Sequence, residues 1–186
     1  MNDFWSIVLT YGILIVLEII MIYYVRKQYE EENKLNLCGS IVHVLIYAAH
    51  GHVFCISCWN NLTSPPPMNK FSTIGFVIAG IGLILVLYSM DFFCNFGTWA
   101  GSNVSGLRTN GIYSYTRNPQ FVFYAIFLIG FAIPWWNRYA VLGLFAYCIL
   151  VFVMVRIEEK HLTKIFGAEY LEYCQRVPRF IGFSHK

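Results

Sequence analysis

Five long apolar runs dominate the sequence, and shorter polar segments separate them. The runs cover residues 4–25, 37–59, 71–93, 121–136 and 139–156. A helix needs ~20 residues to cross the hydrocarbon core of a bilayer, and we take each run as long enough to do so. The pattern therefore predicts an all-α integral membrane protein with five transmembrane helices.

Composition agrees with this class. Hydrophobic residues make up 58% of the 186 residues and charged residues only 12%, whereas an average soluble domain is about 25% charged. So much apolar surface cannot be hidden inside a soluble chain of this size. The aromatic residues fall mostly inside the apolar runs rather than among the basic residues, so we expect no nucleic-acid partner. The six cysteines also lie mostly in or beside these runs and indicate no disulfide framework.

The distribution of Lys and Arg predicts the orientation. Five crossings place the 26–36 loop, the 94–120 loop and the tail on one side of the membrane. Eleven of the thirteen basic residues fall on that side, and only Lys70 and Arg138 fall on the other. Basic residues are retained on the cytosolic side, so we expect the N-terminus outside and the C-terminus in the cytosol.

The chain divides at about residue 97. Residues 1–96 hold three N-terminal transmembrane helices, and residues 97–186 hold a cytosolic loop, a two-helix transmembrane hairpin and a tail. In the tail, four apolar side chains are spaced as on one face of an amphipathic helix: Leu162, Ile165, Phe166 and Tyr170. We expect this helix to begin after Arg156, to lie along the cytosolic surface and to fold back on the 105–121 segment, so that the two enclose a pocket.

The 105–121 segment carries the densest candidate chemistry. It combines Arg108 and Tyr113 with the triplet Arg117-Asn118-Pro119, directly before an apolar run. Proline favours the first turn of a helix, whose free N–H groups attract anions, and a nearby guanidinium binds carboxylates in a bidentate manner. These residues indicate a pocket for a carboxylate-bearing molecule. The alternative is that the arginines only set the topology and contact lipid head groups.

Two adjacent acids, Glu158 and Glu159, follow the last apolar run. Carboxylates at the end of a membrane span are costly and tend to be functional, so this pair could hold an ammonium group. The alternative is that they favour the start of the amphipathic helix, where acids suit the helix dipole. The two interpretations are compatible.

The second apolar run contains a set of histidines. His43 and His50 lie seven residues apart on one helical face, and His52 and Cys55 lie near the outer end. A haem or metal site would need several such ligands to converge, whereas single polar side chains can simply pack against neighbouring helices. We expect no metal site, and we take Glu18 as the most plausible partner of one histidine.

The polar segments together resemble the isoprenylcysteine carboxyl methyltransferase family. The matching motifs, in order, are Gly111-Ile112-Tyr113, Arg117-Asn118-Pro119-Gln120-Phe121, Glu158-Glu159, Phe166-Gly167-Ala168-Glu169-Tyr170 and Val177-Pro178-Arg179. The resemblance covers about residues 97–183. The wider group includes phospholipid N-methyltransferases and shares C-terminal similarity with sterol reductases. The family usually has His where this chain has Asn118, which cannot titrate near neutral pH, so we expect this position to bind the cofactor and not to act as a base.

The resemblance implies an integral membrane methyltransferase that transfers a methyl group from S-adenosylmethionine to a lipophilic acceptor entering from the bilayer. The expected acceptor is the carboxylate of a prenylcysteine or a similar lipid. It is already ionised at pH 7 and needs no general base. The alternatives are a phospholipid amine methyltransferase, an NADPH-dependent sterol-type reductase, and a non-enzymatic haem or quinone protein that uses His43 and His50. The active site is expected on the cytosolic side, in the cell membrane of a prokaryote or the endoplasmic reticulum of a eukaryote.

The resemblance also assigns site residues. The family's cofactor-contacting positions fall on Ser105, Gly106, Leu107, Arg108, Tyr113, Asn118, Pro119, Gln120, Phe121 and Glu158. The motif residues around the reaction centre are Arg117 and Glu159. Arg156 lies near, but not in register with, a position where the family places a substrate-binding arginine, and we include it among the catalytic candidates.

Overall fold

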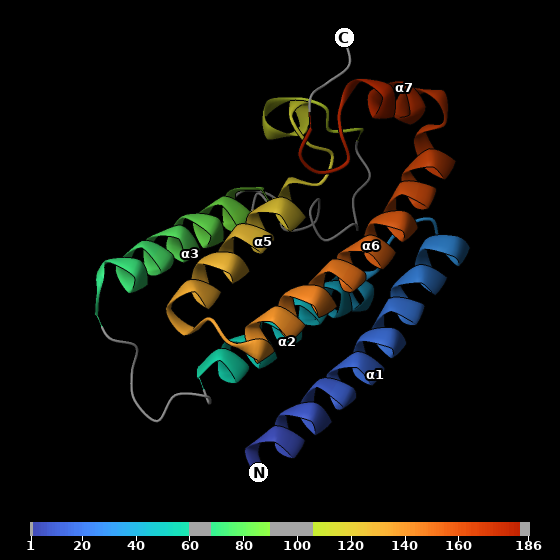
Figure 1. Cartoon of the computed structure of the whole chain (residues 1–186). Helices are drawn as coiled ribbons and strands as arrows, with labels where there is room; N and C mark the ends of the chain where they lie inside the picture. The colour runs from blue at the N-terminus through green and yellow to red at the C-terminus, as the bar shows by residue number, and fades with distance from the viewer. Residues whose placement is uncertain (1, 60–67, 90–105, 183–186) are drawn as a thin grey trace.

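The computed structural model of the chain is built of helices (Figure 1), and it describes residues 2–59, 68–89 and 106–182. The α-helices are α1 (Asn2–Glu31), α2 (Leu37–Trp59), α3 (Lys70–Ser89), α5 (Pro119–Ala132), α6 (Arg138–Phe166) and α7 (Ala168–Arg176). Two short 3₁₀ helices, η1 (Gly111–Ser114) and η2 (Ile133–Trp135), complete the set. The described residues contain no strand, which confirms the predicted all-α class.

Four of these helices are long and apolar enough to cross a membrane. They are the segments Val8–Glu31, Leu37–Cys58, Lys70–Ser89 and Arg138–Phe166. The expected fourth crossing is a shorter apolar segment, Pro119–Trp135, formed by α5 and η2. At 1.5 Å per residue this segment is roughly 25 Å long, a little less than the ~30 Å hydrocarbon core.

The end of the last long helix corrects one sequence prediction. The expected break after Arg156 does not occur, because α6 continues without interruption to Phe166. No Gly or Pro lies between residues 157 and 166. Gly167, which follows this stretch, has a φ of 53°, a positive value that glycine adopts at little cost, and the helix ends there. The separate tail helix is therefore the shorter α7.

The long helices run side by side (Figure 1), with α3 packed along α5 and α1 along α2. Small residues permit the close approach of α3 and α5. A Cβ atom on Gly82 would lie 2.5 Å from the backbone N of Phe127, and one on Gly130 would meet the backbone of Ala79. Such small-residue contacts are typical of helix packing in membranes.

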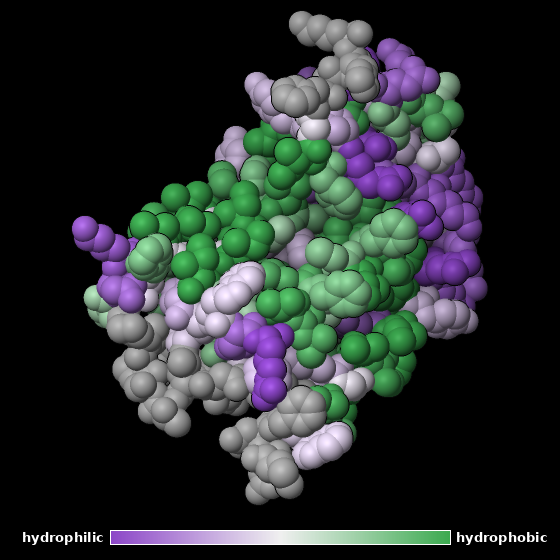
Figure 2. Space-filling model, in the orientation of Figure 1, coloured by the Kyte–Doolittle hydropathy of each residue, from purple (hydrophilic) through white to green (hydrophobic). Residues whose placement is uncertain are grey.

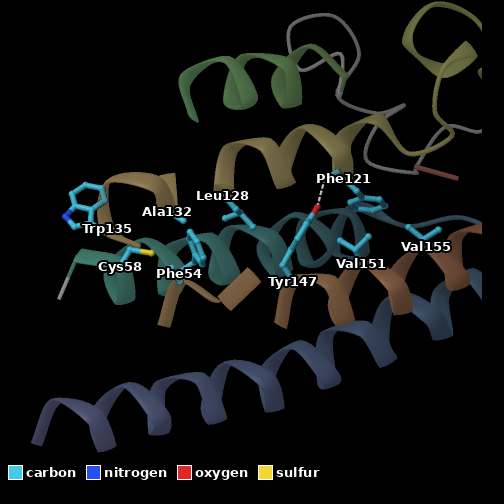
Figure 3. Close-up of a cluster of buried hydrophobic side chains, with 10 residues drawn as sticks. Phe54, Cys58, Phe121, Leu128, Ala132, Trp135, Tyr147, Val151 and Val155 are labelled. Carbon is cyan, nitrogen blue, oxygen red and sulfur yellow. Dashed lines mark hydrogen bonds between the residues drawn. The ribbon is translucent and has the colours of Figure 1, made fainter. Parts of the chain in front are cut away.

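A buried apolar cluster joins α2, α5 and α6 (Figure 3). It includes Phe54 of α2, Leu128 of α5 and Val151 of α6. Within it, the hydroxyl of Tyr147 donates a hydrogen bond of 2.5 Å to the carbonyl of Phe121, which fixes α6 to the first turn of α5.

The outer surface separates into an apolar middle and a polar end. Large apolar side chains such as Ile19, Ile84 and Phe145 are more than half exposed, and apolar residues dominate the middle of the face shown in Figure 2. Polar residues gather near the upper right of that view, where α1 and α6 end. There Lys160 contacts the carboxylate of Glu30 at 3.1 Å. The 26–36 segment and the tail therefore lie at one end of the helices, as the sequence predicts.

Candidate functional site

A cavity of about 740 Å³ lies among α2, α3, α5 and α6, beside the 106–117 segment and α7. Charged and polar side chains line part of it, among them Arg108, Arg117 and Glu158. Apolar side chains such as Leu83 and Phe127 line another part. Along α2 the lining extends from residue 40 to residue 55, which is about 22 Å of helix at 1.5 Å per residue. The cavity thus joins a charged region to a long apolar region.

The structure brings most of the predicted site residues to this cavity. Those that line it are Gly106, Leu107, Arg108, Tyr113, Arg117, Gln120, Phe121 and Glu158. Pro119 is fully buried at the start of α5, behind the lining. Ser105 lies outside the described residues.

Arg156 is not brought to the cavity. Its side chain is exposed, and its guanidinium lies 4.1 Å from the ring centre of Phe152, one turn earlier on the same helix. Residues two positions apart on a helix do not share a face, so Arg156 and Glu158 point in different directions.

Glu159 bridges two arginines. Its Oε1 lies 2.9 Å from Nη1 of Arg117, and its two oxygens accept hydrogen bonds of 2.9 and 2.6 Å from Arg179. The side chains of Glu159 and Arg117 are only 15% and 12% exposed, so this interaction is poorly screened by solvent. The hydrogen bond to Glu159 also raises the pKa of Arg179 above its ordinary value. In this arrangement Glu159 holds Arg117 in place.

Arg117 still has hydrogen-bonding capacity. Its Nη1 contacts Glu159 and also lies 2.6 Å from Sγ of Cys174. Its Nε is buried and has no partner among the described residues. A buried guanidinium N–H without a partner is costly, and an anion that entered the cavity could satisfy it.

Asn118 binds the C-terminal segment. Its side-chain amide donates a 2.9 Å hydrogen bond to the carbonyl of Arg179, which also accepts a 3.3 Å bond from the hydroxyl of Thr116. The backbone N–H of Arg117 donates to the carbonyl of Pro178 at 3.0 Å. The amide thus supplies the donor that fastens the 116–118 segment to the 178–179 segment, a role that the sequence did not reveal.

The tail packs over the 106–117 segment, as predicted. The hydroxyl of Tyr173 in α7 donates a 2.6 Å hydrogen bond to the carbonyl of Tyr113. Burial raises the pKa of Tyr173 to about 12, so the hydroxyl keeps the proton that it donates. Tyr170 and Val177 form a buried cluster with Tyr173, and Leu107 packs against this cluster.

The two histidines of α2 have different surroundings. His43 lines the cavity, and its Nε2 lies 3.2 Å from Oε1 of Glu158. His50 is fully buried, and its Nε2 lies 3.2 Å from the carbonyl oxygen of Gly143. Both therefore have partners other than Glu18. In the part of the chain that the structure describes, no three His, Cys, Asp or Glu side chains converge as a metal site would require.

Sequence reasoning missed most of the α2 face of this site. Ser40, Tyr47 and Gly51 line the cavity together with His43. They are spaced three or four residues apart, as on one side of a helix. A stripe of small and polar residues at this spacing inside an apolar run is the signal that could have identified the face.

Comparison with known proteins places this geometry in context. Residues 71–169 match the sequence model of a family described as phospholipid methyltransferase. The chain is similar to phosphatidylethanolamine N-methyltransferase of Pyricularia oryzae, with 27% identity over 142 residues, which cover 71% of this chain and 15% of that relative. It is also similar to protein-S-isoprenylcysteine O-methyltransferase B of Arabidopsis thaliana, with 34% identity over 79 residues, which cover 41% of this chain and 40% of that relative. The chain therefore matches less than half the length of each. No solved structure matches it.

Proposed function

This chain belongs to the phospholipid methyltransferase family, and we propose that it transfers a methyl group from S-adenosylmethionine to a lipophilic acceptor in the membrane. The observation that carries the proposal is the cavity of about 740 Å³ in which charged side chains and a long apolar lining meet. A polar methyl donor suits the charged region, and the hydrocarbon tail of an acceptor suits the apolar region.

The family and the apolar helices make this a multi-pass membrane protein. We further propose five crossings, with the segment Pro119–Trp135 as the fourth, the N-terminus outside and the C-terminus in the cytosol. The excess of Lys and Arg at the end that carries the 105–121 segment supports this orientation. The division at residue 97 also remains a proposal. Both segments contribute to the cavity, so they would act as one functional unit.

The lining residues suit S-adenosylmethionine. The buried Nε of Arg117 would bind its carboxylate, and the carboxylate of Glu158 would bind its ammonium group. Tyr113 and Phe121 offer aromatic rings for an adenine. When bound, this donor supplies an electrophilic methyl group on a positively charged sulfur.

The residues of the chain would act mainly by orientation and exclusion of water. Glu159 and Arg179 would hold the guanidinium of Arg117 in place, and α7 with the 178–179 segment would cover the charged region. Placement of the two reactants in a dry, fixed geometry can supply much of the rate enhancement. Asn118 and Glu159 would therefore be positioning residues, and the proposed reaction does not use Arg156.

Two acceptor classes remain candidates. One is the carboxylate of a prenylcysteine or a similar lipid, in keeping with the name of the Arabidopsis relative. The other is a phospholipid amine, in keeping with the family description and the name of the Pyricularia relative.

Calorimetry on detergent-purified protein tests the proposal. We expect S-adenosylmethionine to bind and NADPH not to bind. Glu158→Gln removes a charged hydrogen-bond acceptor worth about 1.5–3 kcal/mol and should weaken binding roughly 10- to 100-fold. The matched control is Glu169→Gln, which changes an exposed glutamate in the first turn of α7. Tight binding of NADPH, or equal affinities in the wild type and Glu158→Gln, would overturn the proposal.

Incubation of membranes with labelled S-adenosylmethionine then identifies the acceptor. A label on an extracted lipid or prenylcysteine supports the proposed reaction. Donor binding without label transfer to any lipophilic compound contradicts it.

A further inference from the structure

The cavity contains a histidine–glutamate pair whose histidine has no role in the proposed binding of the methyl donor. His43 of α2 lines the cavity and lies 3.2 Å from Glu158 of α6. The side chains are 19% and 15% exposed, so the pair is largely shielded from solvent. His43 also lies outside the segment 71–169 that matches the family. The family match therefore assigns nothing to it.

The geometry of the pair selects one form of the imidazole. Nε2 of His43 faces Oε1 of Glu158 and must carry a hydrogen to donate to that carboxylate. In the neutral ring, Nδ1 is then left with the lone pair and can accept a proton. When it does so, the nearby carboxylate stabilises the resulting imidazolium, as in other carboxylate–histidine pairs.

We propose that His43, held by Glu158, is the catalytic base for an amine acceptor. The inference rests on the proposed function, because it needs the same methyl donor and the same cavity. Nδ1 of His43 removes one proton from the ammonium group of the lipid. The freed lone pair on nitrogen forms the new N–C bond while the C–S bond of the donor breaks, and that electron pair stays on sulfur. The product is a methylated ammonium with the same charge as the starting lipid, and the proton on His43 leaves to solvent.

Acceptor chemistry decides whether such a base is needed. A carboxylate already has a free lone pair at pH 7, whereas an alkyl amine resembles lysine, with an ordinary pKa near ~10, and is almost wholly protonated. A positioned base typically contributes ~10²–10⁴-fold to such a reaction. His43 is thus a residue on which N-methylation depends and O-methylation does not.

The titratable and charged groups near His43 can influence how the rate of methyl transfer depends on pH. Tyr29 of α1, Tyr47 of α2 and His161 of α6 line the same cavity. The charged side chains in the lining are Arg108, Arg117 and Glu158. Among these, Glu158 forms the ion pair with His43 and so keeps Nε2 occupied.

To test the proposal, the rate of methyl transfer by His43→Gln is compared with that of the wild type. The acceptor is phosphatidylethanolamine in phosphatidylcholine nanodiscs. Glutamine keeps a polar side chain of similar reach but cannot take a proton. We expect methyl transfer at pH 7 to fall at least 100-fold while the affinity for S-adenosylmethionine stays within twofold, which also shows that the variant is folded. The loss should shrink as the pH rises, because the fraction of free amine increases about tenfold per unit below its pKa. A rate unchanged by the substitution, or a loss that is the same at all pH values, would overturn the proposal.

A binding measurement gives an independent readout without the methyl donor. In protein with ¹⁵N-labelled histidine, the signal absent from His43→Gln belongs to His43. We expect its Nδ1 resonance to move when phosphatidylethanolamine is added, and not with phosphatidylcholine alone, whose nitrogen carries no proton. No movement with either lipid contradicts the proposal.

Failure of the inference and failure of the proposed function give different results. If the wild type binds S-adenosylmethionine but methylates only a farnesylated cysteine carboxylate, the base assignment is wrong and the proposed function stands. If the wild type does not bind S-adenosylmethionine, both are wrong.

Discussion

Two glycines of α3 should respond in opposite directions to the same substitution. Gly82 faces α5, and a Cβ atom there would lie 2.5 Å from the backbone N and 2.8 Å from the Cα of Phe127. Gly80, two residues earlier, has nothing within 4 Å of the corresponding position. Gly80→Ala is therefore a control within the same helix for Gly82→Ala.

The magnitude follows from these distances. Ordinary carbon contacts lie near ~3.5–4.0 Å, so α3 and α5 would have to separate by about 1 Å at Gly82. Backbone atoms cannot move aside as a flexible side chain can, and such overpacking typically costs about 1–3 kcal/mol. Both substitutions gain about 0.5–1 kcal/mol from the lower flexibility of alanine in the unfolded chain. We therefore expect Gly80→Ala to be stabilising, and Gly82→Ala to be less stable than Gly80→Ala by about 1–3 kcal/mol.

Equilibrium unfolding in mixed detergent micelles measures this difference. Tryptophan fluorescence is a suitable signal, because the Trp135 side chain is buried in the folded protein. Comparison of the two variants with each other cancels the helix-propensity contribution. If Gly82→Ala proves as stable as Gly80→Ala, the close contact between α3 and α5 is not a feature of the folded protein in the membrane environment.

Three other substitutions test the arrangement around the cavity. Arg156→Gln should leave methyl transfer within twofold, because this guanidinium lies outside the cavity; a tenfold loss would support the sequence-based assignment instead. Glu159→Gln should cost about 3 kcal/mol in the same unfolding titration, because it leaves the buried guanidinium of Arg117 without its charged partner. Asn118→Ala should cost about 1 kcal/mol, the value of one hydrogen bond to the carbonyl of Arg179, and an unchanged midpoint would contradict a contribution of this hydrogen bond to stability.

Much of the fold could be read from the sequence. The bounds of α2 agree with the predicted apolar run, and α3, α5 and α6 begin within two residues of the predicted starts. Apolar runs predict membrane helices well, because in a helix that crosses a membrane the backbone polar groups must be paired within the same segment. The extension of α6 was missed because a change from apolar to amphipathic composition was taken as a break, although no Gly or Pro lies between residues 157 and 166.

The candidate site was predicted less completely. The 106–121 segment and Glu158 reach the cavity as expected, because both lie at the polar end of the helices. The lining from α2 was not predicted, since an apolar run does not reveal which of its faces meets a cavity. Only the packing of α2 against α1, α5 and α6 decides that rotation.

The sequence by itself determined the class of protein, the helices and the end at which the charged residues gather, since these depend on local composition and on hydrophobicity. Only the tertiary structure decided which side chains of one helix reach the cavity. Arg156 and Glu158 are two residues apart, yet only Glu158 reaches the cavity, where it meets His43 from a distant part of the chain. Asn118 likewise found its partner sixty-one residues away in Arg179. Each residue of a helix turns the side-chain direction by about 100°, so the orientation of a side chain depends on the packing of the whole helix.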